Sequence, residues 1–427
     1  MLATPGYSAI MPRNRFQEIL TSLNFNNNDN YIAYGKEGYD PIFHIRPIID
    51  AIVPNFSKVY SVAQELSLDE MTIAFKGKHH LKQYNPKKPD KWGYKVFVLS
   101  EAITGYVTEW NMYTGIETPA MTPEGRTLSF THSIVRELVS PYYNYSHHVY
   151  MDRFYSSPAV ATEFAKNNTG FCGTVDYRKK GMPDEVQPEV LSLKRGDKPF
   201  FMRSGSLLAM AWQDTKRVTM LTTIHNNSTI LKKTRTRHNS KGFYKKEIPF
   251  CVNQYNQYMC GVDISDLRFK VYLNPHRSAK PFKRVFDALL SVSVINAHII
   301  YCQVKKNGKM NTKRFIQSLV RSFTSAYVQN DPQRRALKRG FSLTSFPDAK
   351  PLKGHYLKDS GKKLPCIMCK INRGVEEITS YICGQCDISL CPHPCHKLYH
   401  IMLSSDSFVE KVKSESQALL KNKLSKN

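Results

Sequence analysis

The sequence predicts an α/β protein with a mixed sheet, a helical region before the sheet and a small cysteine-rich module after it. Strand-like and helix-like patterns alternate between residues 67 and 176, which favours a sheet covered by helices. Apolar residues recur at helical spacing before that stretch. Six of the ten cysteines fall between Cys366 and Cys395, close to the other end of the chain.

Residues 1–66 are predicted to be mostly helical, with "RNRFQEILTSLNF" as the clearest amphipathic piece. The pattern then changes to strands in "LSLDEMTIAFKGK", "GYKVFVLSEA" and "YVTEWNMYTG". Thr104-Gly105 marks the turn between the last two, so an antiparallel meander is expected. A helix in "THSIVRELVS" precedes the strand "HHVYMD", and a further helix leads to the strand "GFCGTVDY".

The second half of the chain changes character several times. Residues 177–250 are predicted to form an inserted, mostly β element that includes the basic stretch "STILKKTRTRHNSKGFYKKE". Helix returns over 251–330, first in "YNQYMCGVDISDLRFKVY" and then in "KRVFDALLSVSVINAHIIYCQVKK". We expect a basic linker at 331–363, the cysteine-rich module at 364–402 and a Lys- and Ser-rich tail at 403–427.

The charge of the chain indicates its partner. The 427 residues include 61 Lys and Arg against 35 Asp and Glu, a formal net charge of +26. Such an excess suits a polyanion, because Lys and Arg contacts to phosphate would supply most of the affinity. A protein whose zinc module only binds other proteins would leave this charge unexplained.

The sequence also favours an intracellular compartment. No apolar stretch approaches the roughly 20 residues of a membrane span, and the start "MLATPGYSAIMPRNRF" lacks the apolar region of a signal peptide. We therefore expect no membrane contact and a reducing compartment, where clustered cysteines bind metal rather than form disulfides. The charge favours the nucleus, and "LKKTRTRHNSK" and "PQRRALKRG" are candidate import signals.

Asp69 and Asp152 stand at unusual places in two predicted strands. In "SLDEMTIAF" the alternation of side chains puts Asp69 on an apolar face, where a carboxylate is costly unless it is paired or binds a metal. A strand-edge aspartate is the simpler interpretation. Asp152 ends the strand "HHVYMD", and an N-cap role would explain it, but Ser156 or Ser157 already fills that role.

Asp263 and Asp266 in "GVDISDLR" are three residues apart, so on a helix they project from one face. An ordinary solvated helix start would give the same pattern. Two strand-end carboxylates and one or two from a helix could also converge on a pair of Mg²⁺ ions, which take oxygen ligands shared with phosphate. Such a pair would serve phosphodiester chemistry, in agreement with the basic charge.

A family resemblance joins these residues. "LDEMTIAFKGKHHLKQYNPKKPDKWGYKVFVL", "YMDRFYSSP", "GTVDYRKKGMP", "GSLLAMAWQD" and "YNQYMCGVDISD" closely resemble piggyBac-type DDE transposases and the proteins derived from them. The match runs from about Arg13 to His400. It implies a ribonuclease-H-like catalytic domain interrupted by a β insertion. It also implies a catalytic triad at Asp69, Asp152 and Asp263 that binds Mg²⁺ or Mn²⁺, with Asp266 assisting.

The chain departs from the family pattern at several places. Arg153 stands where the family usually carries Asn, and Cys260 where it usually carries Gly. Pro281-Phe282 replaces a common tryptophan pair, which would weaken stacking on an end base. The amino terminus begins late, so upstream parts of the DNA-binding and dimerisation region are expected to be missing. These changes are expected to affect the efficiency of transposition, and the ability of the chain to carry it out alone, more than the fold.

The resemblance implies cleavage and transfer of DNA strands at TTAA sites by a homodimer bound to double-stranded transposon ends. Lys88, Lys91 and Lys95 of the signature block, and Arg277 in a later basic loop, are expected to contact DNA. An ordinary basic sheet face would look the same. The alternative function is a domesticated descendant that binds DNA or chromatin without transposing; the intact triad argues against it and the short amino terminus for it.

The cysteine-rich module carries paired ligands at zinc spacing. A disulfide cluster or a catalytic zinc fits the compartment and the number of ligands less well. Two interleaved tetrahedral sites of RING or PHD type, a cross-brace, are expected, and it stays open whether His393 or His396 takes part. One assignment gives the first site Cys366, Cys369, Cys391 and Cys395, and the second Cys383, Cys386, His396 and His400. In the family this module binds transposon-end DNA.

Overall fold

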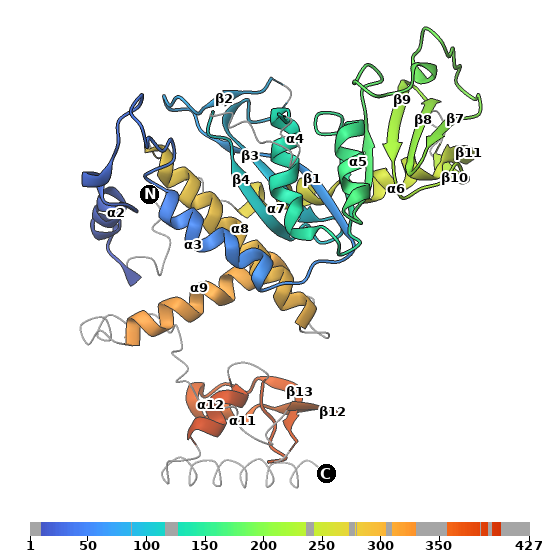
Figure 1. Ribbon diagram of the computed structural model, residues 1–427. Helices are drawn as coiled ribbons and strands as arrows, with labels where there is room; N and C mark the ends of the chain where they lie inside the picture. The colour runs from blue at the N-terminus through green and yellow to red at the C-terminus, as the bar shows by residue number, and fades with distance from the viewer. Residues whose placement is uncertain are drawn as a thin grey trace. The chain divides into compact units, whose positions relative to one another are not determined.

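The computed structural model is built around a nine-stranded mixed sheet (Figure 1). Two units are described separately, residues 11–324 and a unit made of 325–427 with 1–10. The structure describes residues 10–86, 88–115, 127–235, 243–272, 278, 280–304, 310–329, 357–384, 386–391 and 395–402.

The sheet has the strand order β2-β3-β1-β5-β6-β9-β8-β7, with β4 also paired to β3. Its strands are β1 (Glu65–Ala74), β2 (Gln83–Tyr84), β3 (Trp92–Glu101), β4 (Val107–Met112), β5 (His148–Met151), β6 (Gly170–Thr174), β7 (Phe200–Ser204), β8 (Leu207–Gln213) and β9 (Arg217–Thr222). The meander β1-β3-β4 is antiparallel as predicted, with a Gly105 turn at a φ of 70°. β5 and β6 continue the sheet in parallel with β1.

Helices cover both faces of this sheet (Figure 1). In chain order they are α2 (Arg13–Ser22), α3 (Arg46–Lys58), α4 (Phe130–Val139), α5 (Pro158–Lys166), α6 (Phe250–Tyr258), α7 (Gly261–Tyr272), α8 (Pro281–Val304) and α9 (Thr312–Gln329). Short 3-10 turns lie at Asn28–Asn30, Ser140–Tyr142 and Asp184–Val186. α4 and α5 pack on one face through residues such as Val135 and Phe164. α3, α7 and α8 pack on the other through Phe56, Phe269 and Leu289.

The alternation of side chains in β1 sorts its residues between two cores. Leu66 and Leu68 face the core under α4 and α5, whereas Met71 and Ile73 face the core under α3, α7 and α8. Asp69 shares the register of the second pair, because successive side chains point to opposite faces. The apolar face expected for Asp69 is therefore the face that α7 covers.

The β-rich insertion is less separate than the sequence suggested. β9 pairs with β6, so β7, β8 and β9 extend the central sheet instead of forming a sheet of their own. Only β10 (Thr229–Arg235) and β11 (Phe243–Pro249) form an independent two-stranded ribbon among the described strands of the insertion. Edge backbone groups of β6 need partners, and β9 supplies them.

Three further expectations differ from the structure. The helix expected over "YNQYMCGVDISDLRFKVY" is two helices, because α6 ends at Tyr258 and α7 starts at Gly261. The expected linker 331–363 includes the start of a strand, β12 (Leu357–Pro365). The boundary between the two units also falls inside α9, shortly before the expected limit at residue 330. The tail 403–427 lies outside the described residues.

The cysteine-rich unit consists of β12, α11 (Ile367–Arg373), β13 (Ile378–Cys383) and α12 (Cys395–Met402). β12 and β13 form an antiparallel pair, and α11 ends at Gly374 in the left-handed conformation typical of a C-cap. Its core is small: four of its eight buried members are the cysteines Cys366, Cys369, Cys383 and Cys395. Apolar burial alone is therefore a weak source of stability for this unit.

One described helix, α8, is long and apolar enough to cross a membrane by length and composition, contrary to the expectation that no apolar stretch approaches that length. In the structure α8 packs along the sheet and buries Val285, Leu289, Val292 and Ile295 in the core. This burial accounts for its composition.

Candidate functional site

Asp69 and Asp152 are neighbours across two parallel strands. Leu68 of β1 pairs with Met151 of β5 in a parallel ladder. Asp69 follows Leu68 and Asp152 follows Met151, so the two aspartates lie side by side. Burial, and then the negative charges of Asp152 and Asp69, raise the pKa of Tyr255 of α6 to about 12. The sheet thus presents two carboxylates on the face that α6 and α7 cover.

The electrostatics of this pair favour a cation between the carboxylates. Burial, and then the negative charges of Glu70 and Asp152, raise the pKa of Asp69 above its usual range. Burial and the charge of Glu70 likewise raise the pKa of Asp152. Raised carboxyl pKa values mean that the charged forms lack sufficient compensation in the protein alone. A divalent cation would supply that compensation.

Local backbone contacts hold Asp152 at the end of β5. Its Oδ1 accepts a hydrogen bond of 2.8 Å from the backbone N–H of Phe154, and its carbonyl accepts from the hydroxyl of Ser156 at 2.8 Å. Ser157 caps α5, since its hydroxyl accepts from the N–H of Val160. Asp152 is therefore not the N-cap.

Asp263 and Asp266 lie on the first turns of α7. Asp263 is exposed, whereas Asp266 is half-buried and pairs with Lys270 at 2.8 Å. Burial raises the pKa of Asp266, although the hydrogen bond from Lys270 opposes the shift. Asp266 Oδ1 is buried without a hydrogen-bond partner among the described residues, which is unusual for a carboxylate oxygen. Such an oxygen suits a metal ligand.

The start of α7 is fixed against the sheet by close backbone contact. A Cβ placed on Gly261 would come within 2.4 Å of Ser67 Oγ and 2.8 Å of the carbonyl oxygen of Glu101. The hydroxyl of Ser67 accepts a 3.2 Å hydrogen bond from the N–H of Val262, so a strand residue caps the helix. This contact sets the position of Asp263 relative to β1.

We expect Gly261→Ala to lower the free energy of unfolding by about 1–3 kcal/mol, because the backbone at Glu101 cannot yield as a flexible side chain would. If the chain cleaves DNA, displacement of α7 should also reduce the rate by about a hundredfold, the effect of roughly 1 Å of misplacement. Chemical denaturation and a cleavage assay measure the two effects. Cys260→Ala, one residue earlier and exposed, is the matched control. Equal stability of both variants would contradict the packing argument.

The predicted DNA-contacting lysines lie around the carboxylates to different degrees. Lys88 Nζ donates to the backbone oxygen of Glu70 at 3.2 Å, and its charge acts on the carboxyls of Glu70 and Asp266. Lys95 Nζ lies 4.3 Å from the ring centroid of Phe154, and its charge acts on Asp152. Lys91 is exposed at the start of β3. Arg277 lies outside the described residues.

The four aspartates form two pairs rather than one closed cluster. Asp69 and Asp152 lie together on the strands, and Asp263 and Asp266 lie together on α7. No three carboxylates among the described residues bring their ligand atoms within 4.8 Å of one another. Lys88 links the two pairs. It donates a hydrogen bond to the backbone of Glu70 on β1, and its positive charge opposes the rise in the pKa of Asp266 on α7.

The first group of four cysteines in the terminal unit has the geometry of a zinc site. Cys366, Cys369, Cys391 and Cys395 have sulfur atoms that all lie within 4.8 Å of one another. Cys369 Sγ is 3.5 Å from Cys395 Sγ and 3.8 Å from Cys391 Sγ. Four thiolates at about 2.3 Å from a tetrahedral zinc ion would be separated by about 3.8 Å. Cys369 of α11, Cys395 of α12 and the flanking Cys366 and Cys391 thus bring their sulfur atoms together. That they bind zinc stays a prediction.

The second group joins β13 and α12. Cys383, His396 and His400 offer ligand atoms within 4.8 Å of one another, and Cys386 Sγ is 3.4 Å from His400 Nε2. His400 Nδ1 is 2.6 Å from the carbonyl oxygen of His396. A carbonyl can only accept, so Nδ1 carries the proton and Nε2 is left for a metal. Of the two histidines left open, His396 joins the group and His393 lies outside the described residues.

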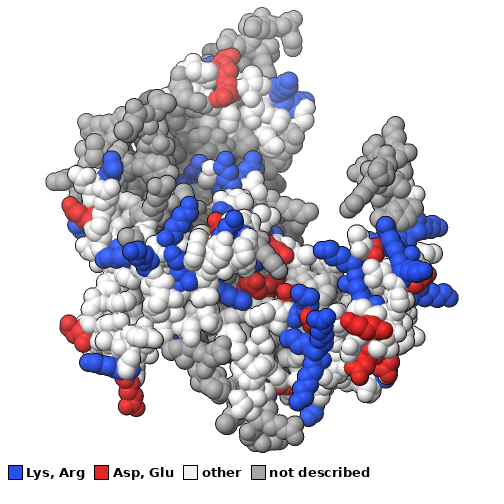
Figure 2. Space-filling model, turned by 90° about the horizontal axis from the view of Figure 1, so that it is seen from above, with Lys and Arg blue, Asp and Glu red and all other residues white. Residues whose placement is uncertain are grey.

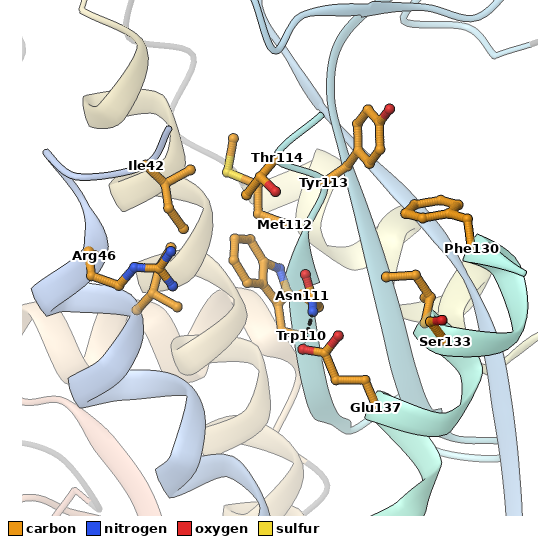
Figure 3. A pocket seen from close by; sticks show the side chains of 12 residues that line it. Ile42, Arg46, Trp110, Asn111, Met112, Tyr113, Thr114, Phe130, Ser133 and Glu137 are labelled. Carbon is orange, nitrogen blue, oxygen red and sulfur yellow. Dashed lines mark hydrogen bonds between the residues drawn. The ribbon is translucent and has the colours of Figure 1, made fainter. Parts of the chain in front are cut away.

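A polar cavity of about 340 Å³ lies between α3, β4 and α4, away from the aspartates (Figure 3). Arg46 reaches it from α3, and Glu137 of α4 is hydrogen-bonded to Asn111 of β4 (Figure 3). The Arg46 guanidinium also makes two 2.9 Å hydrogen bonds to Asp40. Because Arg46 and Glu137 already bind protein partners, this cavity is a weaker candidate for a reaction site than the aspartates.

The structure adds site residues that the sequence did not single out. Glu70 follows Asp69 and accepts a 3.0 Å hydrogen bond from the hydroxyl of Tyr155. Tyr255 and Ser67 contribute through α6 and the cap of α7. Glu70 stood inside a quoted motif, but nothing in its spacing distinguished it. No sequence pattern pointed to the two tyrosines or to Ser67, because their roles depend on contacts with residues distant in the chain.

Comparisons with known proteins agree with these features. A family profile described as "Transposase IS4" matches residues 1–298, and a "DDE_Tnp_1-like zinc finger" matches residues 353–401. The human PiggyBac transposable element-derived protein 3 is 22% identical over 389 residues, which cover 90% of this chain and 62% of that protein. The human PiggyBac transposable element-derived protein 2 is 22% identical over 369 residues, covering 84% and 59%. The chain thus spans about three fifths of these curated relatives.

Among solved structures, a chain of the piggyBac transposase synaptic complex with hairpin DNA, determined by cryo-electron microscopy, has the same fold. The TM-score is 0.67 at 22% identity, and the alignment covers 92% of this chain and 81% of that one. The predicted fold class, a mixed α/β domain followed by a cysteine-rich unit whose side-chain clusters could hold zinc, is therefore confirmed.

Proposed function

This chain belongs to the piggyBac-type transposase family, and from that premise we propose that it is a metal-dependent enzyme that cuts DNA strands and transfers them at TTAA sites. The observation that carries the proposal is the pair Asp69 and Asp152, adjacent on parallel strands and lacking sufficient positive charge from the protein. Asp263, with Asp266 beside it, would complete the ligand set from α7.

The donor set fits a hard divalent ion such as Mg²⁺ or Mn²⁺, because it consists of carboxylate oxygens, one of them buried without a hydrogen bond among the described residues. Two such ions would activate the attacking oxygen and stabilise the leaving oxygen of the phosphodiester. Lys88 and Lys95, beside the carboxylates, would hold phosphate groups of the strand being cut. Ser67 and Gly261 would keep the helix carboxylates in register with the strands.

Double-stranded DNA is the proposed partner, with transposon ends as the specific substrate. Lys and Arg spread over one face of the molecule and flank acidic side chains near its middle (Figure 2). The net charge of +26 supports the same partner. We further propose that the chain acts in the nucleus as a homodimer that carries zinc. The zinc module would recognise the DNA ends.

A strand-cleavage assay tests the proposal. Purified full-length chain is incubated with a labelled duplex that carries a TTAA-flanked terminal repeat from its own locus, with and without Mg²⁺. Nicking at the repeat boundary that needs the metal is the expected result. Bound but uncut DNA at every metal concentration would instead favour the alternative, a domesticated DNA-binding protein that does not transpose.

The β10–β11 ribbon places lysines opposite each other, and this repulsion between positive charges favours DNA as a partner. Lys232 pairs with Lys246 and Lys233 pairs with Lys245, so lysines stand directly opposite each other across the ribbon. Like charges in such pairs destabilise a free ribbon. Lys246 is compensated by an ion pair with Asp214, but Lys233 and Lys245 are exposed on the outer face. Phosphates between them would relieve the repulsion.

We expect the double variant Lys233→Ala, Lys245→Ala to weaken DNA binding about equally for all sequences. The slope of log affinity against log salt should fall by about 2, since each phosphate contact contributes about 0.9. Titrations of a fluorescent duplex at several salt concentrations measure this slope. The exposed Lys58 at the end of α3 provides the control, Lys58→Ala. An unchanged slope in the double variant would remove the ribbon from the DNA interface.

A further inference from the structure

Two large aromatic side chains lie exposed beside each other on the hairpin of β2 and β3. Tyr84 and Trp92 are a cross-strand pair, and their ring centroids are 4.6 Å apart at an angle of 42°. Their exposed fractions are 52% and 46%, whereas the other two of the three tryptophans, Trp110 and Trp212, are 4% and 5% exposed. β2 is the last strand at one end of the sheet, so the pair lies at its edge (Figure 1).

The exposure of these rings is not explained by the stability of the hairpin. Cross-strand aromatic pairs do stabilise a hairpin, by a fraction of a kcal/mol. Tryptophan is nevertheless highly buried on average, and burial is the larger source of stability. Single apolar side chains on a surface are ordinary, but two adjacent rings at a sheet edge are typical of an interface, where tyrosine and tryptophan are enriched. The pair therefore indicates a binding surface.

Lysines surround the pair. Lys82 Nζ lies 4.6 Å from the centroid of the Trp92 ring and donates to the carbonyl oxygen of Gly77 at 2.8 Å. An ammonium group has three donors, so Lys82 keeps donors for an anion. Lys91, next to Trp92, is exposed. The one acidic residue of the segment 76–95, Asp90, lies 4.0 Å from Lys270. The same segment has seven lysines, Lys76, Lys78, Lys82, Lys87, Lys88, Lys91 and Lys95.

We propose that Tyr84 and Trp92 form a stacking platform for unpaired bases of DNA, and that Lys82 and Lys91 hold the adjacent phosphates. Proteins bind single strands by this combination of exposed rings and positive charge. Inside a duplex the faces of each base are covered by its neighbours, so only an unpaired base has a face to offer. An acidic peptide would leave the rings without a use, and an apolar ligand would leave the lysines without one. The choice of DNA as the ligand rests on the proposed function.

The hairpin connects this platform to the aspartates. Lys88, in the turn between β2 and β3, donates to the backbone oxygen of Glu70, the neighbour of Asp69. Val98 of β3 pairs with Asp69, and Trp92 is the first residue of the same strand. At about 3.3 Å per residue the platform is about 20 Å from Asp69 along β3, or about six base steps of 3.4 Å along one DNA strand. Bases on the platform would therefore lie about six positions from the bond being cut.

Tryptophan fluorescence tests this assignment, because Trp92 is the one exposed tryptophan of three and the structure describes all of them. The full-length, zinc-loaded chain is titrated with a single strand of about 12 thymidines, a length that single-strand sites cover. An abasic strand of the same length carries the same phosphates without bases. We expect the thymidines to quench Trp92 and to bind about five- to tenfold more tightly than the abasic strand, the low end for one stacked base. Trp92→Phe should remove the quenching.

Variants separate stacking from charge and from folding. Tyr84→Ala should abolish the preference for the base-containing strand, whereas Tyr84→Phe, which keeps the ring, should retain it. A hairpin that was merely loosened by Tyr84→Ala would weaken both strands alike, so the ratio of the two affinities measures stacking. Lys82→Ala should also weaken both strands alike and lower the slope of log affinity against log salt by about 1. Tyr145→Ala, at another exposed tyrosine, is the control and should change neither quantity.

Three results would overturn the platform. The first is equal binding of the two strands, or full preference in Tyr84→Ala. The second is equal quenching of Trp92 by heparin or by an acidic peptide, since charge alone would then explain the contact. The third is a blunt duplex that quenches Trp92 as strongly as the single strand, because its bases are paired.

The outcome is separable from that of the proposed function. Asp152→Asn protein, which should not cut DNA, should retain both the quenching and the preference for bases. Base preference without cleavage by the unaltered chain would overturn the enzymatic proposal and leave the platform standing. Cleavage without base preference would overturn the platform alone. Binding of neither the single strands nor the duplex would overturn DNA as the partner, and the platform with it.

Discussion

Replacing Asp152 by alanine is expected to abolish Mg²⁺-dependent cleavage, by about a thousandfold or more, while DNA binding persists. Asp152 directly follows β5, whereas Asp69 lies within the neighbouring strand β1 and not, as the sequence had suggested, at its end. The two would share the metal ions, so neither can substitute for the other. Binding should survive because it comes from Lys and Arg contacts to phosphate. A cleavage assay and a binding titration on the same preparation measure both quantities.

The asparagine variant sharpens this test. Asp152→Asn retains an oxygen that can accept the hydrogen bond from the N–H of Phe154, so the local backbone should be preserved. It also removes a buried charge next to Glu70, and the free energy of unfolding should therefore not decrease. Asp184→Asn, at an exposed position in the insertion, is the control. Cleavage by Asp152→Asn at the rate of the control would exclude Asp152 from metal binding.

Removal of zinc is expected to unfold residues 357–402 and leave the central sheet folded. The terminal unit has a small core, and half of its buried members are cysteines that would be metal ligands. Their thiols must lose protons to bind zinc, so folding and metal binding should occur together. Atomic absorption should find two zinc ions per chain. Hydrogen exchange after chelation should show loss of protection in β12, α11, β13 and α12, while the strands of the central sheet stay protected.

Cys383→Ser should remove the second zinc and reduce the preference for specific DNA ends more than the affinity for bulk DNA. Cys383 Sγ lies 3.3 Å from His400 Nε2, so a serine leaves the β13 side of that site with a weaker ligand. Cys260→Ser, at an exposed cysteine outside the module, should keep both ions. If the chain bound its specific DNA ends normally without zinc, this prediction would be wrong. Unchanged end preference in Cys383→Ser would remove end recognition from the module.

Local backbone contacts hold His400 and Cys366 in forms that can bind a metal. The hydrogen bond between His400 Nδ1 and the carbonyl of His396 depends only on the helical geometry of α12. Burial raises the pKa of Cys366, but the backbone N–H groups of Cys391 and Cys369 outweigh it and hold that pKa below its usual range. Both effects favour the forms that bind metal.

The sequence by itself determined the features that depend on chain neighbours. Alternation in β1 put Asp69 on the face that α7 covers, because side-chain direction follows from strand pleating alone. Ser157 ahead of Pro158 marked the start of α5, and Gly105 marked the turn of the meander. Motif order identified the family and, with it, the fold class.

The tertiary structure decided what depends on residues distant in the chain. That β9 completes the edge of β6 follows from competition among strands, which no local pattern records. The break between α6 and α7 is set by close packing of Gly261 on Ser67 and Glu101. Tyr94, His44 and His79 come together only because β3, the N-terminal region and the loop after β1 meet in space. Propensity acts within a few residues, whereas these contacts join segments tens to hundreds of residues apart, and only packing brings them into contact.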